Sequence, residues 1–318
     1  MKFQMPKVLI TDYVEDPVYE KSVLGDDVSL EANSDVQVLL VWRARIDGAI
    51  MDKYPDLKAI IRYGVGTENV DFDAAAQRGL VVCNTPDYGV DEVALTAISF
   101  LLYFDRAIAT YNLKARRHTH GSWQSTEKHL RRAGNSTVGC IGAGRIGSAF
   151  LLKARALGFD TVLYDPYKPS GYEKVLTSNR VNSLEEFLSV SDYVSIHVIL
   201  TEETAGMVDD AFVEQMKRRA VLINTSRGQV FDGLDFLVEP LKSGRIGGVA
   251  LDVLPQEPPD KGLLIDAWRS GEDWMRGRVL INPHTAYFSQ QAFQEMRTKA
   301  AQNALRILLG EAPLNRLN

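Results

Sequence analysis

Three residues whose types suit acid–base and anion chemistry follow apolar, strand-like runs in the second half of the chain. Arg227 comes after "AVLINT", Glu257 comes shortly after "GVALDV", and His284 comes after "VLIN". A guanidinium holds a carboxylate and polarises a carbonyl group, and a histidine oriented by a carboxylate donates or accepts a proton near neutral pH. The set therefore suits proton transfer at a carbonyl or hydroxyl group that lies next to a carboxylate.

Each of these residues also has an ordinary structural explanation. Arg227 can donate to backbone carbonyls, Glu257 can be a solvated loop charge before Pro258, and His284 can cap the helix that follows it. Parallel strands bring their carboxyl ends to one edge of a sheet, and ligands of such sheets bind at that edge. We therefore expect the three side chains to form one site.

A phosphate-binding turn is indicated by "TVGCIGAGRIG", which places Gly142, Gly144 and Gly147 between a strand-like and a helix-like run. Such glycines allow a tight turn, close approach of the backbone to a pyrophosphate, and helix–strand packing. The next strand ends at Asp165, close to the spacing of about 20 residues at which an acid binds a ribose 2′-hydroxyl. The pattern predicts NAD rather than NADP, although Asp165 also suits a turn cap before Pro166.

The elements that would position these residues alternate between strand-like and helix-like along the whole chain, which predicts an α/β fold with parallel sheets. A long helix is expected over 91–116, and a polar segment, 116–136, separates two series of strands. A last helix, 290–309, is expected to return to the first domain. The expected strands are 8–11, 36–42, 59–64 and 80–84 in the first series, and 137–142, 161–165, 193–198, 220–225, 248–253 and 279–282 in the second.

Composition and charge are those of an ordinary soluble protein. The 318 residues suit two domains, and the net charge of −5 argues against a nucleic acid or an anionic membrane as a partner. The most apolar run, 93–104, is too short to span a bilayer and predicts a buried helix. Cys83 and Cys140 lie in strand-like runs without disulfide or metal-ligand spacing, so we expect buried thiols, no metal and a cytoplasmic location.

The sequence resembles the NAD-dependent, D-isomer-specific 2-hydroxyacid dehydrogenase family along essentially its whole length. The segments that carry the resemblance are "RYGVGTENVD", "VGCIGAGRIG", "YDPY", "SIHVILTEET", "LINTSRGQVFD", "GGVALDVLPQEP" and "NPHTAY". The resemblance implies two doubly wound parallel sheets, with a flavodoxin-like substrate domain of residues 1–105 and 290–318, a Rossmann cofactor domain of residues 106–289, and the cleft between them. It also implies a homodimer formed through the cofactor domain.

The resemblance gives roles to individual residues. Arg227, Glu257 and His284 correspond to the catalytic arginine, glutamate and histidine. The backbone N–H groups of Val65 and Gly66 are expected to bind the substrate carboxylate. Besides the three glycines of the turn, the expected NAD contacts are Thr96, Arg145, Ile146, Asp165, His197, Thr204, Thr225 and Asp252.

Two departures from the family pattern, and one residue that matches it, bear on substrate and partner. Ile199 stands where the family usually has proline, and Tyr287 stands where the related C-terminal-binding-protein branch, to which the motifs are closest, has tryptophan. Glu257 argues against formate as a substrate, because formate dehydrogenases carry glutamine there. Tyr287 is therefore expected to form an aromatic wall of the substrate site.

Two alternatives to a D-2-hydroxyacid dehydrogenase remain open at this point. One is an NAD-sensing, corepressor-like interaction protein with weak dehydrogenase activity. We expect an enzyme instead, because the printed sequence carries no appended regulatory tail. The other is a phosphoglycerate-type dehydrogenase, in which Arg43, Arg45 and Arg62 meet a substrate phosphate instead of being solvated or ion-paired.

Overall fold

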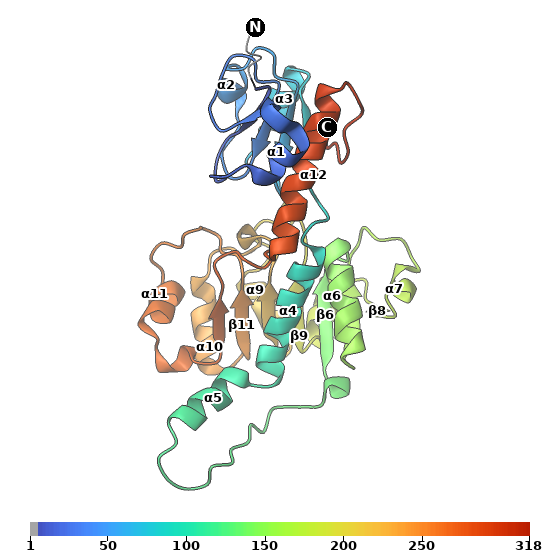
Figure 1. The fold of residues 1–318 in the computed structure, drawn as a ribbon. Coiled ribbons are helices and arrows are strands. Elements are labelled where there is room, and N and C mark those ends of the chain that lie inside the picture. The colour runs from blue at the N-terminus through green and yellow to red at the C-terminus, as the bar shows by residue number, and fades with distance from the viewer. Residues whose placement is uncertain (1–5) are drawn as a thin grey trace. The chain divides into compact units, whose positions relative to one another are not determined.

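The computed structural model describes residues 6–318, which form two compact units, each built around its own parallel sheet. The first unit contains the described residues up to Gly89 together with Phe288–Asn318, and the second is Val90–Tyr287. The fold class expected from the sequence is confirmed. Figure 1 labels the helices and strands of both units.

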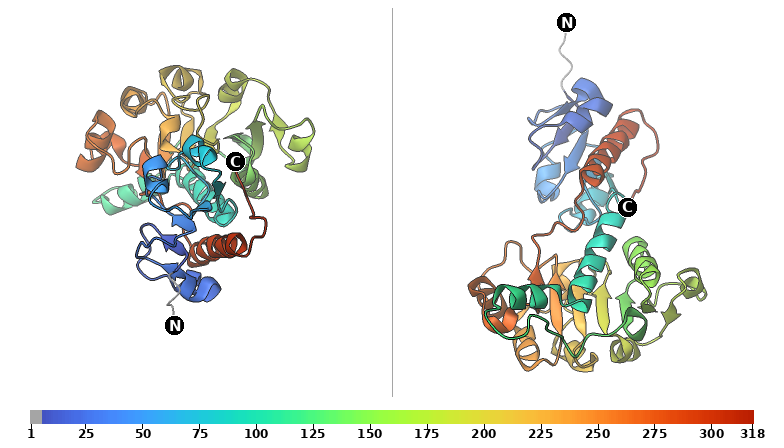
Figure 2. Two further views of the ribbon diagram at one scale, coloured as in Figure 1. Left: turned by 90° about the horizontal axis from the view of Figure 1, so that it is seen from above. Right: turned by 60° about the horizontal axis from the view of Figure 1, so that its bottom comes forward.

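The first unit has a five-stranded sheet in the order β2-β1-β3-β4-β5, the flavodoxin-like arrangement. Helices α1 and α12 pack against each other on one face, and α2 and α3 cover the other (Figure 2). The strands are β1 Val8–Ile10, β2 Val28–Ser29, β3 Val38–Val41, β4 Ala59–Arg62 and β5 Val81–Cys83. The helices are α1 Val18–Leu24, α2 Gly48–Met51, α3 Phe72–Gln77 and α12 Gln290–Leu308.

A buried ion pair ties the C-terminal helix α12 to the N-terminal helix α1. Arg297 is 5% exposed and Glu20 is fully buried, and Nε and Nη2 of Arg297 donate to the two carboxylate oxygens of Glu20 at 2.8 and 2.6 Å. The Tyr63 hydroxyl donates to the same carboxylate at 2.7 Å. This bidentate pairing satisfies the buried charges and confirms that the last helix returns to the first unit.

The second unit has a seven-stranded sheet in the order β12-β11-β10-β9-β6-β7-β8. Helices α4 and α6 cover one face, and α8 to α11 cover the other. The strands are β6 Thr137–Ile141, β7 Asp160–Tyr164, β8 Asn179–Arg180, β9 Tyr193–Ile196, β10 Val221–Asn224, β11 Gly248–Leu251 and β12 Val279–Ile281. The helices are α4 Val90–Asp105, α5 Ile108–Arg116, α6 Arg145–Ala156, α7 Tyr172–Val175, α8 Leu184–Val190, α9 Asp210–Gln215, α10 Val238–Ser243 and α11 Leu263–Ser270.

The boundary between the two units differs from the sequence expectation. We expected the first domain to include residues up to 105, but α4 belongs to the second unit. The reason is packing, because Ala97, Leu101 and Phe104 of α4 lie in one apolar cluster with residues of α6 and β10. The second break falls at Phe288 rather than at residue 290.

Two local features were also expected differently. The helix expected over 91–116 is divided into α4 and α5 at Ala107, whose φ of +48° interrupts the helical backbone. The short edge strands β2 and β8 were not expected, because two residues give no readable alternation. Cys83 and Cys140 are buried free thiols as expected.

Among the described helices none is long and apolar enough by itself to cross a membrane. Helices α4 and α5 together meet that test by length and composition only, with a bend of 52° between them.

Candidate active site

The residues expected to do chemistry in the second unit lie at the carboxyl ends of its strands. Strand β6 is followed by β7 and β8 on one side, whereas β9 to β12 continue on the other side. The chain therefore reverses its direction of winding between β6 and β9, and ligands of doubly wound sheets bind in the crevice at such a point. The loops after β6, β7, β9, β10, β11 and β12 carry most of the candidate residues.

The three glycines of the turn after β6 have the geometry that a dinucleotide requires. Gly142 has a φ of +85°, and a side chain there would meet the His197 carbonyl oxygen at 2.7 Å. A side chain at Gly147 would meet the Gly142 oxygen at 2.0 Å, so helix α6 packs directly on the turn. Gly144 faces open space and caps the N-terminus of α6, where backbone N–H groups and the helix dipole favour a phosphate.

Asp165 has the turn-capping role that its position at the end of β7 suggested. One carboxylate oxygen accepts from the Tyr167 backbone N–H at 3.0 Å, which forms the turn around Pro166. The other accepts from the Ala143 N–H at 2.8 Å and so joins the end of β7 to the glycine turn. Each oxygen keeps a second lone pair for a ribose hydroxyl, so the structural role and the cofactor role are compatible.

Buried polar atoms without partners mark the places that a cofactor would fill. Among the described residues, the Thr225 hydroxyl and the His197 Nδ1 atom are buried and have no hydrogen-bond partner. His197 Nε2 is held 2.8 Å from the Ser195 hydroxyl. Buried polar groups are normally satisfied, and a ligand in the crevice would supply partners for these two atoms. Together with the open backbone at Gly144, they fit NAD.

Burial lowers the pKa of His197 to about 3, and this makes a prediction about stability. The unfolded chain binds a proton at His197 below pH 6.5, whereas the folded chain keeps this imidazole neutral. Stability therefore falls with pH from about 6.5 downward, by up to about 1.4 kcal/mol per pH unit for this group. We expect His197→Gln to remove that dependence.

The measurement is urea unfolding of the wild type and of His197→Gln at pH 7 and pH 5. The difference in free energy of unfolding between the two proteins should shrink toward pH 5 by about 2 kcal/mol. His118→Gln is the matched control, because His118 is exposed and should show no such change. If the difference in free energy of unfolding between the wild type and His197→Gln were the same at both pH values, the folded protein would not keep the His197 imidazole neutral.

His284 and Glu257 form a pair. Glu257 Oε2 lies 2.7 Å from His284 Nδ1, and Glu257 Oε1 accepts from the Leu254 backbone N–H at 3.0 Å. The imidazole is 36% exposed, so its Nε2 edge has access to a ligand. His284 does not cap α12, because Ser289 takes that place. The two residues, 27 positions apart in the sequence, therefore have the geometry of an oriented acid–base group.

Asp252 fixes the backbone that presents His284. Its carboxylate accepts from the N–H groups of Thr285 and Ala286 at 3.0 and 2.9 Å, and its own carbonyl accepts from the His284 N–H at 2.8 Å. These bonds hold His284 at a φ of +55°, a conformation that non-glycine residues seldom adopt. Burial raises the pKa of the Asp252 carboxyl, and the two backbone donors act against this. The sequence did not reveal this clamp.

Arg227 lies in the loop after β10, next to the loop that carries Glu257. Arg227 Nη1 donates to the Ser226 carbonyl at 2.7 Å, and its own carbonyl accepts from Asn224 Nδ2 at 2.8 Å. A side chain at Gly228 would lie 1.9 Å from the Leu254 carbonyl, so the two loops are in backbone contact at this glycine. The structure thus sets the loops of the arginine and of the glutamate directly against each other.

The other expected cofactor contacts lie on three further elements of the second unit. The Thr96 hydroxyl on α4 donates to the Ala286 carbonyl at 3.3 Å. Thr204 closes the loop after β9 by donating to the Ile199 carbonyl at 2.7 Å, so this loop is ordered without the family's proline. Arg145 and Ile146 begin α6, and Arg145 is exposed. Their roles toward NAD stay predictions.

Val65 and Gly66 lie in the first unit, in the loop after β4. The carbonyl side of this loop is held by the next one, because Asn84 Nδ2 donates to the Val65 oxygen at 2.7 Å and the Thr85 hydroxyl accepts from the Gly64 N–H at 2.6 Å. Among the residues that the structure describes, the N–H groups of Val65 and Gly66 have no acceptor. This leaves two donors for an anion. The sequence had given no role to Asn84 and Thr85.

The arginines considered as phosphate ligands lie in different surroundings of the first unit. The Arg43 guanidinium lies over the Tyr13 ring, 5.4 Å from its centroid, and Arg45 is exposed. The Arg62 guanidinium lies against Gly64, where a side chain would be 3.1 Å from Nη1. Arg62 is therefore adjacent to the loop of Val65 and Gly66.

Comparison with known proteins agrees with these features. The NAD-binding domain model of the D-isomer-specific 2-hydroxyacid dehydrogenases matches residues 98–286. A glyoxylate reductase of Korarchaeum cryptofilum is 34% identical over 86% of this chain and 80% of its own length. A D-3-phosphoglycerate dehydrogenase of Methanocaldococcus jannaschii is 30% identical over 99% of this chain, which spans 60% of that relative's length.

A solved structure is similar over the whole chain. The D-lactate dehydrogenase of Aquifex aeolicus, crystallised with NAD and lactic acid, aligns with a TM-score of 0.81 at 25% identity over 96% of each chain. The seven-stranded sheet of this chain and the glycine turn after β6 are those of a dinucleotide-binding fold. Because the family's NAD-binding domain model and these relatives match, and because the glycine turn and the histidine–glutamate pair are in place, the chain belongs to the D-isomer-specific 2-hydroxyacid dehydrogenase family.

Proposed function

We propose that this chain interconverts a D-2-hydroxy acid and the matching 2-oxo acid with NAD(H), and that His284, Glu257 and Arg227 carry the reaction. The observation that carries the proposal is the 2.7 Å contact between His284 and Glu257 at the strand edge that also bears the glycine turn. The relatives named as a glyoxylate reductase and a D-lactate dehydrogenase support a small 2-oxo acid as substrate.

His284 is the acid and base of the proposed reaction. In the reducing direction the imidazolium donates its Nε2 proton to the carbonyl oxygen of the substrate, while its Nδ1–H stays hydrogen-bonded to Glu257. In the oxidising direction neutral Nε2 takes the hydroxyl proton. Glu257 fixes the ring orientation and stabilises the charged ring, so it positions His284 instead of exchanging the proton itself.

The substrate carboxylate needs donors that do not transfer protons. Arg227 supplies a planar guanidinium that binds a carboxylate and polarises the adjacent carbonyl. The N–H groups of Val65 and Gly66, which have no acceptor among the described residues, supply two neutral donors. Tyr287, whose ring meets the His284 ring edge-on at 6.5 Å between centroids, is placed to border the substrate side chain.

The cofactor-binding residues are assigned from the loops after β6, β7, β9 and β10. When bound, NAD(H) supplies or accepts the hydride. Gly144 and the N-terminus of α6 bind the pyrophosphate, Asp165 binds the ribose hydroxyls, and Thr225 and His197 gain partners for their buried polar atoms. A carboxylate at residue 165 repels the 2′-phosphate of NADP, so NAD is the preferred cofactor.

The experiment is a panel of 2-oxo acids assayed by loss of NADH absorbance, with NADPH alongside. Suitable members are glyoxylate, hydroxypyruvate, phenylpyruvate, 4-methylthio-2-oxobutyrate and phosphohydroxypyruvate, which differ in size and charge. We expect turnover of at least one of them, with kcat/KM about tenfold or more higher for NADH than for NADPH because Asp165 faces the ribose. Asp165→Ser should narrow that ratio.

Two results would contradict the proposal. Tight NADH binding without turnover of any 2-oxo acid would favour a binding protein over an enzyme. A clear preference of the wild type for NADPH over NADH would show that Asp165 does not bind the ribose hydroxyls. If phosphohydroxypyruvate were the best substrate, the proposed type of reaction would stand, and the chain would be a phosphoglycerate-type dehydrogenase.

The expected homodimer stays a prediction and is supported by exposed apolar residues. Helix α5 has no buried residue, Ile108 at its start is 53% exposed, and Trp123 in the segment after it is 68% exposed. Large apolar side chains in an otherwise polar segment are typical of a surface that a partner covers. We propose that a second copy covers them, with sedimentation velocity as the test.

A further inference from the structure

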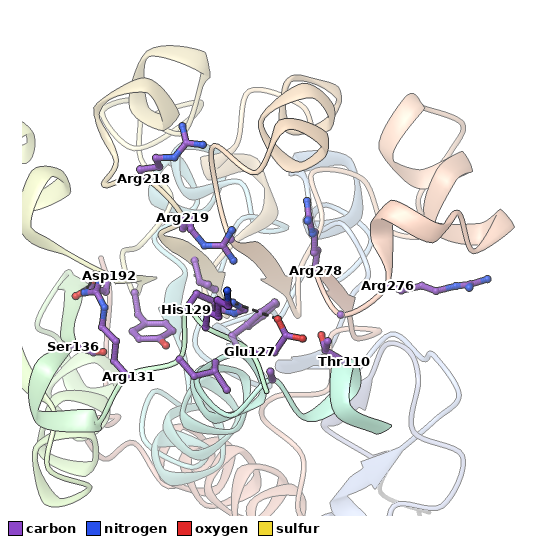
Figure 3. A pocket seen from close by; sticks show the side chains of 18 of the residues that line it. Thr110, Glu127, His129, Arg131, Ser136, Asp192, Arg218, Arg219, Arg276 and Arg278 are labelled. Carbon is purple, nitrogen blue, oxygen red and sulfur yellow. Dashed lines mark hydrogen bonds and ion pairs between the residues drawn. The ribbon is translucent and has the colours of Figure 1, made fainter. Parts of the chain in front are cut away.

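The cavity shown in Figure 3 lies on the surface that the proposed second copy covers. Its lining includes Phe104 at the end of α4, Thr110 on α5 and Glu127 in the segment after α5. A second copy that covers α5 and this segment would also cover the cavity, so the proposed dimer accounts for it. The C-terminal segment, residues 311–318, belongs to the first unit and is a separate feature.

The C-terminal segment follows helix α12 and runs along the outer edge of the first unit's sheet. Strand β5 is the last strand on that side, and an antiparallel bridge pairs its Cys83 with Arg316. The Leu317 N–H donates to the Val82 carbonyl, and the Val82 N–H donates to Asn318 Oδ1, both at 2.9 Å. The segment thus pairs backbone groups of β5 that the edge of a sheet leaves open.

Side chains of helix α12 anchor the C-terminal segment. Asn303 is 4% exposed and bonds both backbone groups of one residue of the segment. Its Nδ2 donates to the Leu314 carbonyl at 2.8 Å, and its Oδ1 accepts from the Leu314 N–H at 2.7 Å. Arg306 Nε donates to the Ala312 carbonyl at 2.7 Å. Because Leu314 is held by both its donor and its acceptor, Asn303 fixes where the segment reaches β5.

The two residues that follow β5 hold the loop after β4, which is expected to bind the substrate carboxylate. The Asn84 N–H, directly after the strand, donates to the Asn315 carbonyl of the C-terminal segment at 3.4 Å. Asn84 Nδ2 donates to the Val65 carbonyl at 2.7 Å. Thr85 bonds both backbone groups of Gly64, because its Oγ1 accepts from the Gly64 N–H at 2.6 Å and its own N–H donates to the Gly64 carbonyl at 3.0 Å. The C-terminal segment and the loop after β4 are therefore joined through two consecutive residues.

Each of the two donors of this loop is directed by a bond on the other side of its peptide plane. The peptide bond is planar and trans, so a carbonyl that is fixed on one side turns the N–H of the same plane to the other side. The Val65 N–H shares a plane with the Gly64 carbonyl, which Thr85 holds, and the Gly66 N–H shares a plane with the Val65 carbonyl, which Asn84 holds. Among the described residues these two N–H groups have no acceptor. Asn84 and Thr85 therefore turn both N–H groups away from themselves and leave them for an anion.

The side chain of Asn84 adds an independent observation. It is 7% exposed, and its Oδ1 atom is buried without a hydrogen-bond partner among the described residues. A buried acceptor without a partner destabilises a fold, so an apolar residue would suit this place better for stability alone. The bond from Nδ2 to the Val65 carbonyl is what an apolar residue could not provide. Asn84 therefore serves the orientation of the loop after β4.

We propose that the C-terminal segment positions the two N–H donors of the loop after β4, and that Asn303 is a positioning residue for substrate binding. The proposal rests on the proposed function, because it takes Val65 and Gly66 as donors to the substrate carboxylate. Asn303 acts at a distance, through the segment, the Asn315 carbonyl and Asn84. Binding of the carboxylate group of a 2-oxo acid therefore depends on a segment that lies far along the chain from the loop that binds it.

The test is the steady-state kinetics of Asn303→Ala with saturating NADH and the best 2-oxo acid of the panel. Alanine suits a helix and removes both bonds to Leu314. We expect KM for the oxo acid to rise roughly tenfold, as for the loss of one hydrogen bond to a charged group, while kcat stays within about twofold of the wild type. This split is expected because donors to the carboxylate act equally on the bound substrate and on the transition state.

Gln302→Ala is the matched control, since Gln302 precedes Asn303 on α12 and is exposed. Its KM and kcat should equal those of the wild type. Asn318→Ala is a second test at an exposed position, where misfolding is a smaller risk, because it removes only the side-chain bonds to the Val82 N–H and the Leu80 carbonyl. We expect its KM to rise about threefold. The NADH affinity of all three variants, measured by fluorescence titration, should equal that of the wild type, because the proposed cofactor residues belong to the second unit.

A double-mutant cycle tests the route through Asn84. Asn84→Ala removes the bond that directs the Gly66 N–H and should itself raise KM roughly tenfold. If Asn303 acts through Asn84, adding Asn303→Ala to this variant raises KM little further, because the route is already broken. A product of the two single effects, roughly a hundredfold, would show that Asn303 acts elsewhere and would overturn the proposal.

Binding of oxamate separates failure of the positioning role from failure of the proposed function. Oxamate, an unreactive isostere of a small 2-oxo acid, is titrated into the NADH-loaded protein, and we expect Asn303→Ala to bind it roughly tenfold more weakly than the wild type. A wild type that neither binds oxamate nor turns over any 2-oxo acid would overturn both proposals. Turnover by the wild type, with unchanged KM and oxamate affinity in Asn303→Ala and Asn318→Ala, would overturn the positioning role alone. So would a loss of kcat in Asn303→Ala without a change in KM.

Discussion

Replacing His284 with Gln is expected to lower kcat by about 10²- to 10⁴-fold, the range for loss of a general acid–base group. Glutamine keeps a polar side chain of similar reach but cannot donate an imidazolium proton. The backbone around residue 284 is held by Asp252 through three hydrogen bonds, none of which involves the imidazole. The loop should therefore keep its conformation, and the affinity for NADH measured by fluorescence titration should remain close to that of the wild type.

Glu257→Gln provides a second readout for the same pair. Without the carboxylate 2.7 Å away, the imidazole loses the partner that fixes its orientation, so kcat of Glu257→Gln should fall by up to about 10²-fold while the affinity for NADH stays close to that of the wild type. His129→Gln is the matched control, since His129 pairs with Glu127 at the opposite edge of the sheet. Turnover of His284→Gln within about threefold of the wild type would remove His284 as the acid.

The fold was predictable from the sequence because parallel strands buried on both faces form continuous apolar runs. The runs of β6, β9 and β10 could be placed to within about one or two residues. The edge strands β2 and β8 were missed because two residues carry no pattern. The unit boundary was misplaced because α4 is apolar enough to suit either core, and only its packing on α6 decides between them.

The site was predictable where residue type alone limits its role, and not where it depends on the backbone. The three glycines and the His284–Glu257 pair followed from spacing, strand ends and family resemblance. The Asp252 carboxylate accepts from the N–H groups of Thr285 and Ala286, and these hydrogen bonds could not be foreseen. They depend on the left-handed backbone of His284, the residue before Thr285. Asp252 was assigned to the cofactor, and in the structure its carboxylate accepts from two backbone N–H groups.

Asp165 shows how two explanations of one residue combine. The sequence suggested either a turn cap or a ribose ligand, and only the hydrogen-bond geometry shows whether one carboxylate can take both roles. In the structure each carboxylate oxygen accepts one backbone N–H, from Ala143 and from Tyr167, and this holds the acid at the end of β7. A carboxylate fixed by its own backbone loses little further freedom on binding a ligand, so the capping contacts favour the proposed cofactor role.

The second large effect is expected at Gly228, a residue without a side chain of its own to act in the reaction. An alanine Cβ there would lie 1.9 Å from the carbonyl carbon and oxygen of Leu254 and 2.5 Å from the Pro255 nitrogen. These are backbone atoms, so no rotamer change relieves the clash, and the two loops must move apart. We expect Gly228→Ala to lower the free energy of unfolding by about 1–3 kcal/mol, the usual cost of overpacking.

The same displacement should lower activity more than stability. Gly228 follows Arg227 directly, and the Leu254 N–H that it would push away donates to Glu257 at 3.0 Å. The clash therefore moves the arginine and the partner of His284 in opposite directions. A shift of about 1 Å in a reacting group can cost about 10²-fold in rate, so we expect kcat/KM to fall by at least that factor.

Gly134→Ala is the matched control for this prediction. Its added Cβ would meet only the Gly158 oxygen, at 3.5 Å, an ordinary contact. Stability and kcat/KM of Gly134→Ala should therefore stay within about 0.5 kcal/mol and twofold of the wild type. Wild-type activity in Gly228→Ala would show that the loops after β10 and β11 can separate without cost, and that the position of Arg227 beside Glu257 does not limit the reaction.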